Sequence, residues 1–376
     1  MLPSPRRDGA DGSRRGVSAP LSRRATLAAA GVALVTATAG CSDVFDDNSG
    51  DSDDENDEDA LVAKTPSETP LLAHLDVAQI AGDDAEAELE ALVAADPGDV
   101  DGAMTAFAAR TGLDPLEADE LLVFGEADAD ADADANSDAD NGDLADDILV
   151  RGGWETADVV DSLEAQTGIT YEETTYLDEA VLYEPSESGP VDVTLDTTLG
   201  DESEDDTPDD ATTVEPAVLG VLEDDAFVVG SESVVEAVLD VEYDGADAVS
   251  GFVRDAYGRA RGAQLTVASA SVGTIVPEQY RMLIDDDPFE DAEAIGRSYA
   301  VTDAGIALEV GLHAADEDEA AELEADLEGT YVPILADVND AFDEARDDLE
   351  IDRDGTVVEL RYEGDSEAVF ALLDEV

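Results

Sequence analysis

The sequence predicts an α+β fold: an antiparallel β-sheet built from hairpins, packed amphipathic helices, and long acidic disordered loops. Apolar residues alternate strictly over 306–312, which predicts a strand with one buried and one wet face. Residues 331–345 carry apolar side chains at helical spacing and predict the clearest amphipathic helix. Asp354-Gly355 is typical of a tight hairpin turn between flanking strands. Strands joined by short turns pair antiparallel, and the helices between them indicate α+β layers.

The elements expected before residue 245 follow from the same two patterns, alternation of apolar residues in strands and helical spacing of apolar residues in helices. Helices are predicted at 89–93, at 100–108 before Gly112, and at 159–163 before Gly168. Strands are predicted in hairpin pairs at 121–124 with 148–150, 171–177 with 180–183, and 217–222 with 227–229. Two acidic segments, 126–147 and 200–215, interrupt this part and are expected to be disordered insertions.

After residue 245 a helical stripe covers 249–260, and Asp316 with Glu319 resembles a capping box for a helix that ends at Gly329. The amphipathic helix from Tyr331 and the 351–357 hairpin complete the chain. A hairpin-then-helix unit recurs loosely on the two sides of residue 245, without a fixed repeat length. This recurrence marks a candidate sub-boundary near residue 245.

The chain is strongly acidic: among 376 residues, 98 are Asp or Glu and 17 are Lys or Arg, a formal net charge of -81. Such a surface repels phosphate, which argues against nucleic-acid binding. A single Cys leaves no internal disulfide and no paired-cysteine metal or redox site. Because apolar periodicity runs through most of the chain, we interpret it as folded rather than disordered.

Lys64 is the only lysine, and acidic residues are spread along the whole chain after residue 41. This composition resembles that of proteins from extremely halophilic archaea. At molar salt the Debye length shrinks to about 3 Å and screens the self-repulsion of the surface. We therefore expect non-specific association with hydrated cations and a fold that needs high salt.

The N-terminal segment has the features of an export signal. Arg23 and Arg24 precede an uncharged, Ala-rich stretch, which ends in small residues before Cys41. A positive region followed by an apolar region of this length is typical of a secretory signal and too short for a good membrane span. An uncleaved membrane helix remains the alternative.

Residues 22–27, SRRATL, resemble a twin-arginine (Tat) signal, although Thr26 stands where Phe is commoner. Residues 38–41, TAGC, resemble a lipobox, with Thr38 in place of the usual Leu. The layout is similar to that of haloarchaeal Tat-exported lipoproteins of unknown function. The resemblance implies export in the folded state, cleavage before Cys41, and a lipid on its thiol that holds the chain on the extracellular face of the cytoplasmic membrane.

These features predict three segments: a signal peptide over 1–40, a lipid-anchored acidic tether over 41–69, and a folded α+β body over 70–376. The tether is polar, acidic and then rich in Thr and Pro, as expected for a solvated spacer.

A search for catalytic motifs gives little. The sequence has no GxSxG, GxGxxG, GxxxxGK[ST] or HExxH motif. His74 and His313 do not form a metal site by themselves, and His313 is expected to be exposed at a strand end. Acidic residues 285–291 form the densest cluster near apolar residues, for which a solvated turn is the simpler interpretation. No cofactor is expected, and metal binding is left open.

Trp154, the only Trp, follows a strand and precedes a helix; core packing is its expected role, with a ligand platform as the alternative. Arg254, Arg259 and Arg261 lie along one helix and could bind an anionic partner, although pairing with nearby acids is the default.

Three functions remain open. The first is a surface lipoprotein with a non-enzymatic binding or envelope-associated role, whose protein or solute partner the sequence does not identify. The second is a solute-binding lipoprotein of a transport system, which needs a cleft between two lobes. The third is a carboxylate-dependent hydrolase, which needs two buried carboxyls facing each other across a cleft.

Overall fold

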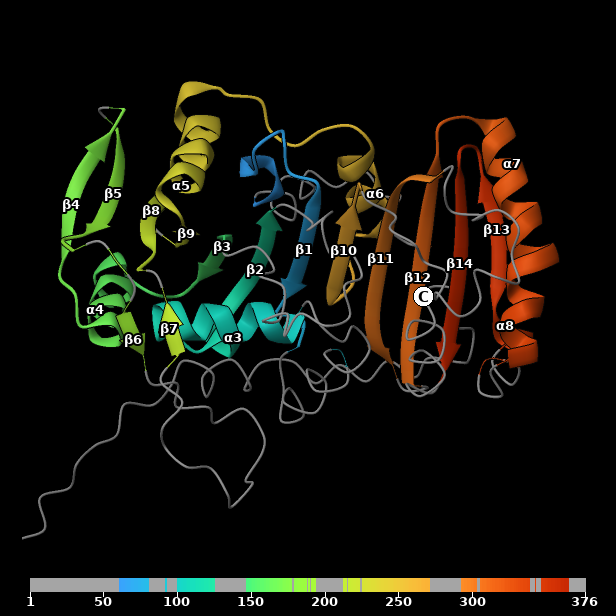
Figure 1. The fold of residues 1–376 in the computed structure, drawn as a ribbon, viewed down its shortest axis with the longest axis horizontal. Coiled ribbons are helices and arrows are strands. Elements are labelled where there is room, and N and C mark those ends of the chain that lie inside the picture. Colours follow the sequence, from blue (N-terminus) through green and yellow to red (C-terminus); the bar gives the residue numbers. More distant parts are fainter. Residues whose placement is uncertain are drawn as a thin grey trace, which may run out of the picture. The chain divides into compact units, whose positions relative to one another are not determined.

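The computed structural model describes residues 61–80, 92, 100–125, 147–177, 179–187, 189, 191–193, 212–214, 216–223, 225–270, 292–302, 305–338, 342 and 346–364. They belong to one compact unit, Asp54–Val376, and most of them build an antiparallel sheet of 12 strands (Figure 1). The export signal, Cys41 and nearly all of the two acidic segments lie outside the described residues.

The first half of the described chain supplies seven strands of the large sheet and a separate two-stranded ribbon. The large-sheet strands are β1 (Leu71–Asp76), β2 (Ala118–Gly125), β3 (Asp147–Gly152), β4 (Tyr171–Tyr176), β5 (Ala180–Pro185), β8 (Val218–Glu223) and β9 (Ala226–Gly230). The ribbon pairs β6 (Val191–Val193) with β7 (Thr212–Val214). The helical elements are η1 (Val62–Lys64), α3 (Val100–Thr111), η2 (Pro115–Glu117), α4 (Thr156–Thr167), α5 (Glu232–Leu239) and η3 (Asp240–Asp244).

The second half supplies the other five strands. They are β10 (Leu265–Ser269), β11 (Ala292–Thr302), β12 (Gly305–Ala314), β13 (Glu350–Asp354) and β14 (Val357–Gly364). The helical elements are α6 (Phe252–Ala260), α7 (Glu317–Asp326), η4 (Leu327–Tyr331), α8 (Val332–Val338) and η5 (Arg346–Asp348). The order across the sheet is β13-β14-β12-β11-β10-β1-β2-β3-β9-β8-β5-β4, so β1 and β10 join the two halves.

The α+β prediction and the predicted hairpins are confirmed: β4–β5, β8–β9 and β13–β14 are antiparallel neighbours, and so are β2 and β3.

Backbone chemistry explains two helix ends. Gly112 and Gly168 follow α3 and α4 with φ of 68° and 71°, a left-handed conformation that glycine adopts without a Cβ penalty. Asp316 caps α7 by accepting hydrogen bonds from the backbone N–H groups of Asp318 and Glu319.

Other sequence predictions differ from the structure. The helix predicted to stop at Gly329 continues through the π turn η4 into α8, and Gly329 does not adopt a positive φ. The stripe predicted from residue 249 becomes helical only at Phe252. The described body begins at Leu61, and both Leu61 and Val62 are buried. Within the segment expected to be a disordered insertion, Thr212–Val214 forms strand β7.

Helices cover both faces of the sheet, and each face has its own apolar core. On one face, α3, α4, α7 and α8 contribute apolar side chains, among them Phe107, Leu163, Leu323 and Val332. On the other face, η1, α5 and α6 pack, and Val235, Val253 and Tyr257 join the core. Both faces of β12 are therefore buried, and the wet face predicted for it is wrong: Ala307, Glu309 and His313 lie within the protein.

The two halves of the sheet repeat one another in topology and register. The β1–β10 ladder runs from Leu71–Ser269 to Leu75–Leu265, symmetrically about its middle pair, Ala73–Val267. Counting outward, β2 corresponds to β11, β3 to β12, β9 to β14 and β8 to β13. The helix α4 after β3 likewise corresponds to α7 after β12. The β4–β5 hairpin has no counterpart among the described residues and extends the sheet on one side.

Candidate functional site

Titratable side chains gather on one face of the second half, where α6 lies on β11 and β12. We call this group the β12–β14 polar cluster; it consists of Arg259 from α6, Ser298 from β11, Glu309 and His313 from β12, and Glu359 and Arg361 from β14. Ser298, Glu309, His313 and Glu359 are all buried, with exposed fractions of 1%, 8%, 6% and 6%. Charged groups are rarely this buried without partners, so their surroundings need explanation.

Strand register places the cluster in three neighbouring rows. Ser298, Glu309 and Arg361 lie directly opposite one another across β11, β12 and β14. The next row contains Gly296, Gly311 and Glu359, and the third contains Ala294, His313 and Val357. Because paired residues have Cβ atoms about 5 Å apart, the side chains of adjacent strands can interact.

Two arginines hold the buried carboxylates. The guanidinium of Arg259 donates to Glu359 through Nε and to Asp354 through Nη2, at 2.7 Å for the latter. The Nη2 atom of Arg361 donates to Glu359 and lies 3.7 Å from a carboxylate oxygen of Glu309. The two arginine charges are therefore shared among three carboxylates, those of Glu309, Glu359 and Asp354.

The environment of the cluster changes the proton affinities of two members. Burial raises the pKa of Glu309, and Arg361 opposes that shift. Burial lowers the pKa of His313, and the nearby Arg259 lowers it further, against the carboxylates of Asp255 and Glu359. His313 is consequently a neutral imidazole near neutral pH, with an N–H on one ring nitrogen and a lone pair on the other.

Three buried polar atoms of the cluster have no hydrogen-bond partner: Ser298 Oγ, His313 Nε2 and Arg361 Nε. The Nε2 atom of His313 lies 3.9 Å from the position that a Cβ on Gly311 would occupy. Buried polar groups are nearly always satisfied, so the three unsatisfied atoms on β11, β12 and β14 distinguish this part of the sheet.

Some of the corresponding positions in the first half are apolar, whereas Glu309 and His313 correspond to the charged residues Asp147 and Arg151. Register symmetry matches Gly296, Gly311 and Glu359 with Leu122, Leu149 and Val228, which are all fully buried. Ser298 likewise corresponds to Phe124. At these four positions the first half of the sheet has large apolar side chains, whereas the second half has two glycines, a serine and a glutamate.

The cluster supplies hydrogen-bond donors and two buried carboxylates. Glu309 and Glu359 both interact with Arg361 and so share one guanidinium. Among the described residues, no group of three or more His, Cys, Asp or Glu side chains could hold a metal ion.

His74 and His313 lie apart, on β1 and β12. His313 was expected to be exposed, but α6 buries it. His74 is also buried; its Nε2 lies 3.9 Å from Glu120, and its ring meets Tyr257 edge-on with centroids 5.9 Å apart.

Trp154 packs against the apolar core beside Phe107, which confirms the packing role expected of it. Arg259 forms ion pairs with the acidic residues Asp354 and Glu359, as the sequence predicted. Arg254 lies over the ring of Tyr257, 5.6 Å from its centroid. Arg23, Arg24, Cys41 and residues 285–291 lie outside the described residues.

Sequence reasoning missed Ser298, Glu309, Glu359 and Arg361. Glu309 and Gly311 stand on the face of β12 that was expected to be wet, where a carboxylate needs no explanation. In a chain with 98 acidic residues, a buried Glu has no signature of its own. The usable signal was the pair of strand glycines, Gly296 and Gly311, since glycine inside a strand marks a close approach or an open space.

No family model matches the chain, and no curated protein sequence matches it. Two solved structures of a protein named TP0453 have a distant likeness. Crystal form III has 8% identity and a TM-score of 0.40, and crystal form I has 9% identity and a TM-score of 0.38. Each match covers 84% of this chain and 97% of the other. Likeness at this level supports no conclusion about activity.

Proposed function

We propose that this chain is an exported, lipid-anchored protein of a halophile that acts at the extracellular face of the cytoplasmic membrane by binding rather than by catalysis. The observation that carries the proposal is the segment from Arg23-Arg24 to Cys41, a positive and then apolar stretch that ends at the only cysteine. Within the described residues, no helix has the length and hydropathy to cross a bilayer.

Two observations favour binding over the alternatives. Among the described residues, the buried carboxylates Glu309 and Glu359 both pair with Arg361 and are held as ion pairs rather than as a free acid–base pair. A solute-binding protein of the two-lobed kind needs lobes that move about a hinge. Here a ladder of five residue pairs between β1 and β10 continues one sheet through both halves, and hinge opening would have to break it.

Membrane fractionation of cells expressing the Cys41→Ser variant tests the anchor. We expect the wild-type protein in the detergent-extractable membrane fraction and the variant in the soluble or secreted fraction, because the variant lacks the thiol that carries the lipid. Ser42→Ala changes the adjacent residue and keeps the thiol, so it should fractionate like the wild type.

Intact-mass measurement of the membrane-bound protein adds a second criterion. A mature chain that starts at Cys41 with added lipid mass supports the proposal. A Cys41→Ser chain that stays in the membrane at its uncleaved mass would instead identify the apolar segment as a membrane helix.

A further inference from the structure

The outer edge of β4 is a sheet edge with little protection against pairing. β4 is the last strand on its side of the sheet, and among the described residues only β5 pairs with it (Figure 1). Edge strands are commonly blunted by a bulge, a proline or a lysine, because their free backbone N–H and C=O groups can pair with another chain. β4 contains no proline or lysine, its ladder with β5 has no bulge, and its charged residues are Glu172 and Glu173.

The edge strand at the other side of the sheet, β13, is protected by its charges against pairing with a second copy of itself. Two copies of one strand pair antiparallel about a two-fold axis, and residues that meet point to the same face of the sheet. One face of β13 carries Glu350, Asp352 and Asp354. Every such register therefore places two carboxylates opposite each other, which is destabilising.

β4 offers a long register without this conflict, the one in which Thr174 lies on the two-fold axis. Thr174 then meets Thr174 of the second copy, Glu173 meets Thr175, and Glu172 meets Tyr176. An axis at Glu173 would place that carboxylate opposite its own copy. An axis at Thr175 would pair only three residues of β4. The register centred on Thr174 is thus the one that pairs most of the strand and separates the glutamates.

We propose that two copies of this chain associate through their β4 edges, antiparallel about a two-fold axis at Thr174, and continue the 12-stranded sheet across the contact. An exposed apolar residue at the end of β4 supports this register. Leu177 follows the strand directly and is 42% exposed, and the register brings it beside Tyr171 of the second copy. Burial of this side chain on association is favourable.

The proposed contact is small and acidic, which determines the conditions in which it forms. One pair of six-residue strands buries little area, so we expect a reversible dimer rather than a permanent one. Molar salt screens the repulsion between two acidic chains and is needed for the association. The contact does not depend on the lipid anchor, and either proposal can fail without the other.

Cysteine crosslinking of the full chain tests the register. All variants carry Cys41→Ser, so the introduced thiol is the only one. Opposed residues of antiparallel strands have Cβ atoms about 5 Å apart, so Thr174→Cys should form a disulfide-linked dimer rapidly with copper phenanthroline in molar potassium chloride. Thr175→Cys is the matched control, because its two thiols lie diagonally and farther apart, and it should crosslink much more slowly. Equal rates for the two variants, or no crosslink in Thr174→Cys, would overturn the proposal.

Sedimentation of the full chain over a concentration series in molar potassium chloride tests the charge pattern. Residue 175 meets Glu173 of the other copy twice in each dimer. Thr175→Lys should therefore lower the dissociation constant of the dimer and Thr175→Glu should raise it, each by about fivefold. Ser233→Lys and Ser233→Glu make the same charge changes on the exposed surface of α5 and should change the constant much less. A wild-type chain that stays monomeric at every concentration, assemblies larger than a dimer, or equal shifts at residues 175 and 233 would contradict the proposal.

Discussion

At the scale of single residues, the few basic side chains have a large structural effect because one of them can bind two carboxylates at once. Lys64, the only lysine, is 7% exposed and lies just before β1. Its Nζ donates to Glu242 at 2.7 Å and to Glu223 at 3.1 Å, which ties η1 to η3 and to the end of β8. Burial by itself would lower the pKa of Lys64, but the hydrogen bonds to Glu242 and Glu223 raise it above its ordinary value.

Lys64→Met should therefore destabilise the folded protein by about 1–2 kcal/mol at pH 7, since it removes two charge-assisted hydrogen bonds to partly exposed carboxylates. A raised lysine pKa contributes stability that is complete below the unfolded-state pKa and is lost as pH rises through the higher folded-state pKa. Denaturant unfolding at constant high salt should give the variant a lower free energy of unfolding than the wild type up to about pH 10. Above that pH the difference between the two free energies should become smaller. Lys64→Arg keeps the charge and should recover part of the loss. A difference that is absent at pH 7 would show that the ion pairs contribute nothing.

At the scale of elements, glycines in two adjacent strands decide how closely α6 approaches the sheet. Gly296 lies under the backbone of Ala256, where any side chain would clash, while a Cβ at Gly311 on the neighbouring strand would meet only ordinary contacts. Close approach at Gly296 brings Arg259 of α6 within reach of Glu359 on β14 and Asp354 on β13. The contact between helix and sheet thus positions the polar cluster.

Gly296→Ala should push α6 away from β11 and cost about 1–3 kcal/mol, because the clashing atom belongs to the backbone and cannot rotate aside. Gly311→Ala is the matched control: it makes the same change on the paired residue, where the new methyl group meets only ordinary contacts. We expect its free energy of unfolding to equal or slightly exceed that of the wild type. Equal stabilities of the two variants in denaturant unfolding would contradict the close packing of α6.

The sequence was informative for elements with strong local signals and not for those that depend on distant contacts. The hairpin turn at Asp354-Gly355 and the helix ends at Gly112 and Gly168 were predicted because backbone chemistry determines them locally. Strands β1, β10 and β11 were missed, since their sequences show no clear alternation and they are buried on both faces. The polar cluster could not be predicted because it depends on the register between strands and on the position of α6.

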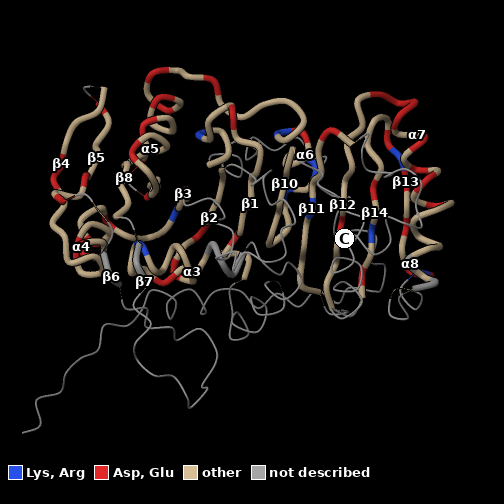
Figure 2. Tube along the Cα trace, in the orientation of Figure 1, with Lys and Arg blue, Asp and Glu red and all other residues tan. Residues whose placement is uncertain are grey.

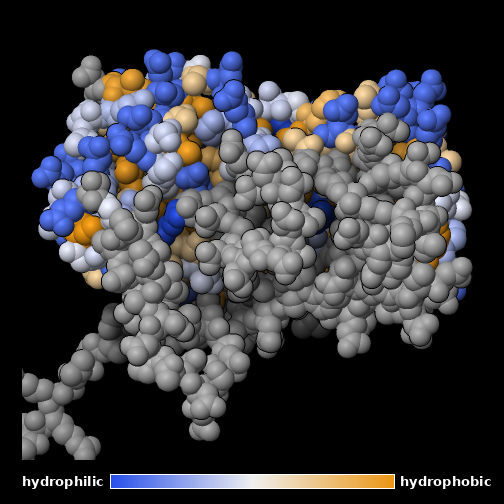
Figure 3. Space-filling model, viewed as in Figure 1, coloured by the Kyte–Doolittle hydropathy of each residue, from blue (hydrophilic) through white to orange (hydrophobic). Residues whose placement is uncertain are grey.

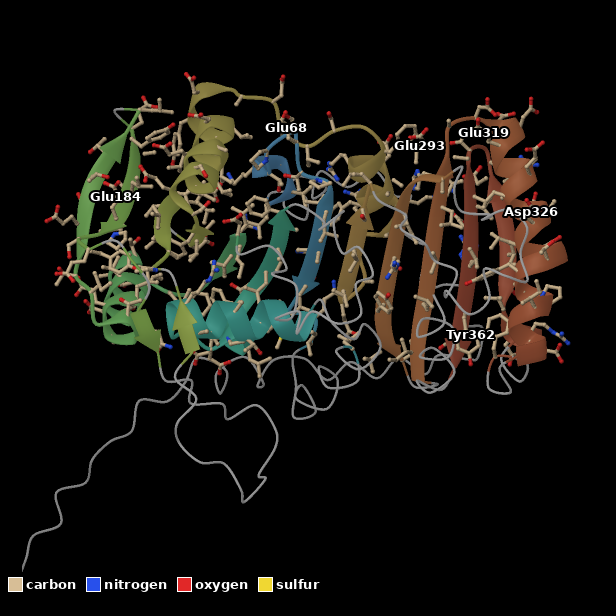
Figure 4. All side chains as sticks on the ribbon, viewed as in Figure 1. Glu68, Glu184, Glu293, Glu319, Asp326 and Tyr362 are labelled. Carbon is tan, nitrogen blue, oxygen red and sulfur yellow. The ribbon has the colours of Figure 1, made fainter. Side chains whose placement is uncertain are left out.

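At the scale of the whole molecule, charge is distributed unequally between surface and interior. Figure 2 shows acidic residues along the outer turns and on α7, and basic residues scattered among the strands and near α6. Hydrophilic residues dominate the visible described surface around α5 and α7 (Figure 3). Among the labelled side chains, Glu319 and Asp326 lie on the outside of α7 (Figure 4). Most of the described acids therefore contribute repulsion at the surface, and few of them contribute specific bonds.

This arrangement predicts that the protein unfolds when salt is removed. At molar salt the Debye length is about 3 Å, so surface carboxylates about 10 Å apart are screened from one another. At 0.1 M salt the Debye length is about 10 Å, and the carboxylates repel one another again. We expect the circular-dichroism signal of the folded protein to persist in molar potassium chloride and to decrease as the salt is diluted below roughly 1 M. Because screening depends on ionic strength, sulfate at equal ionic strength should also preserve the fold. A signal unchanged by dilution into low salt would show that packing alone outweighs the repulsion of a chain with a net charge of -81.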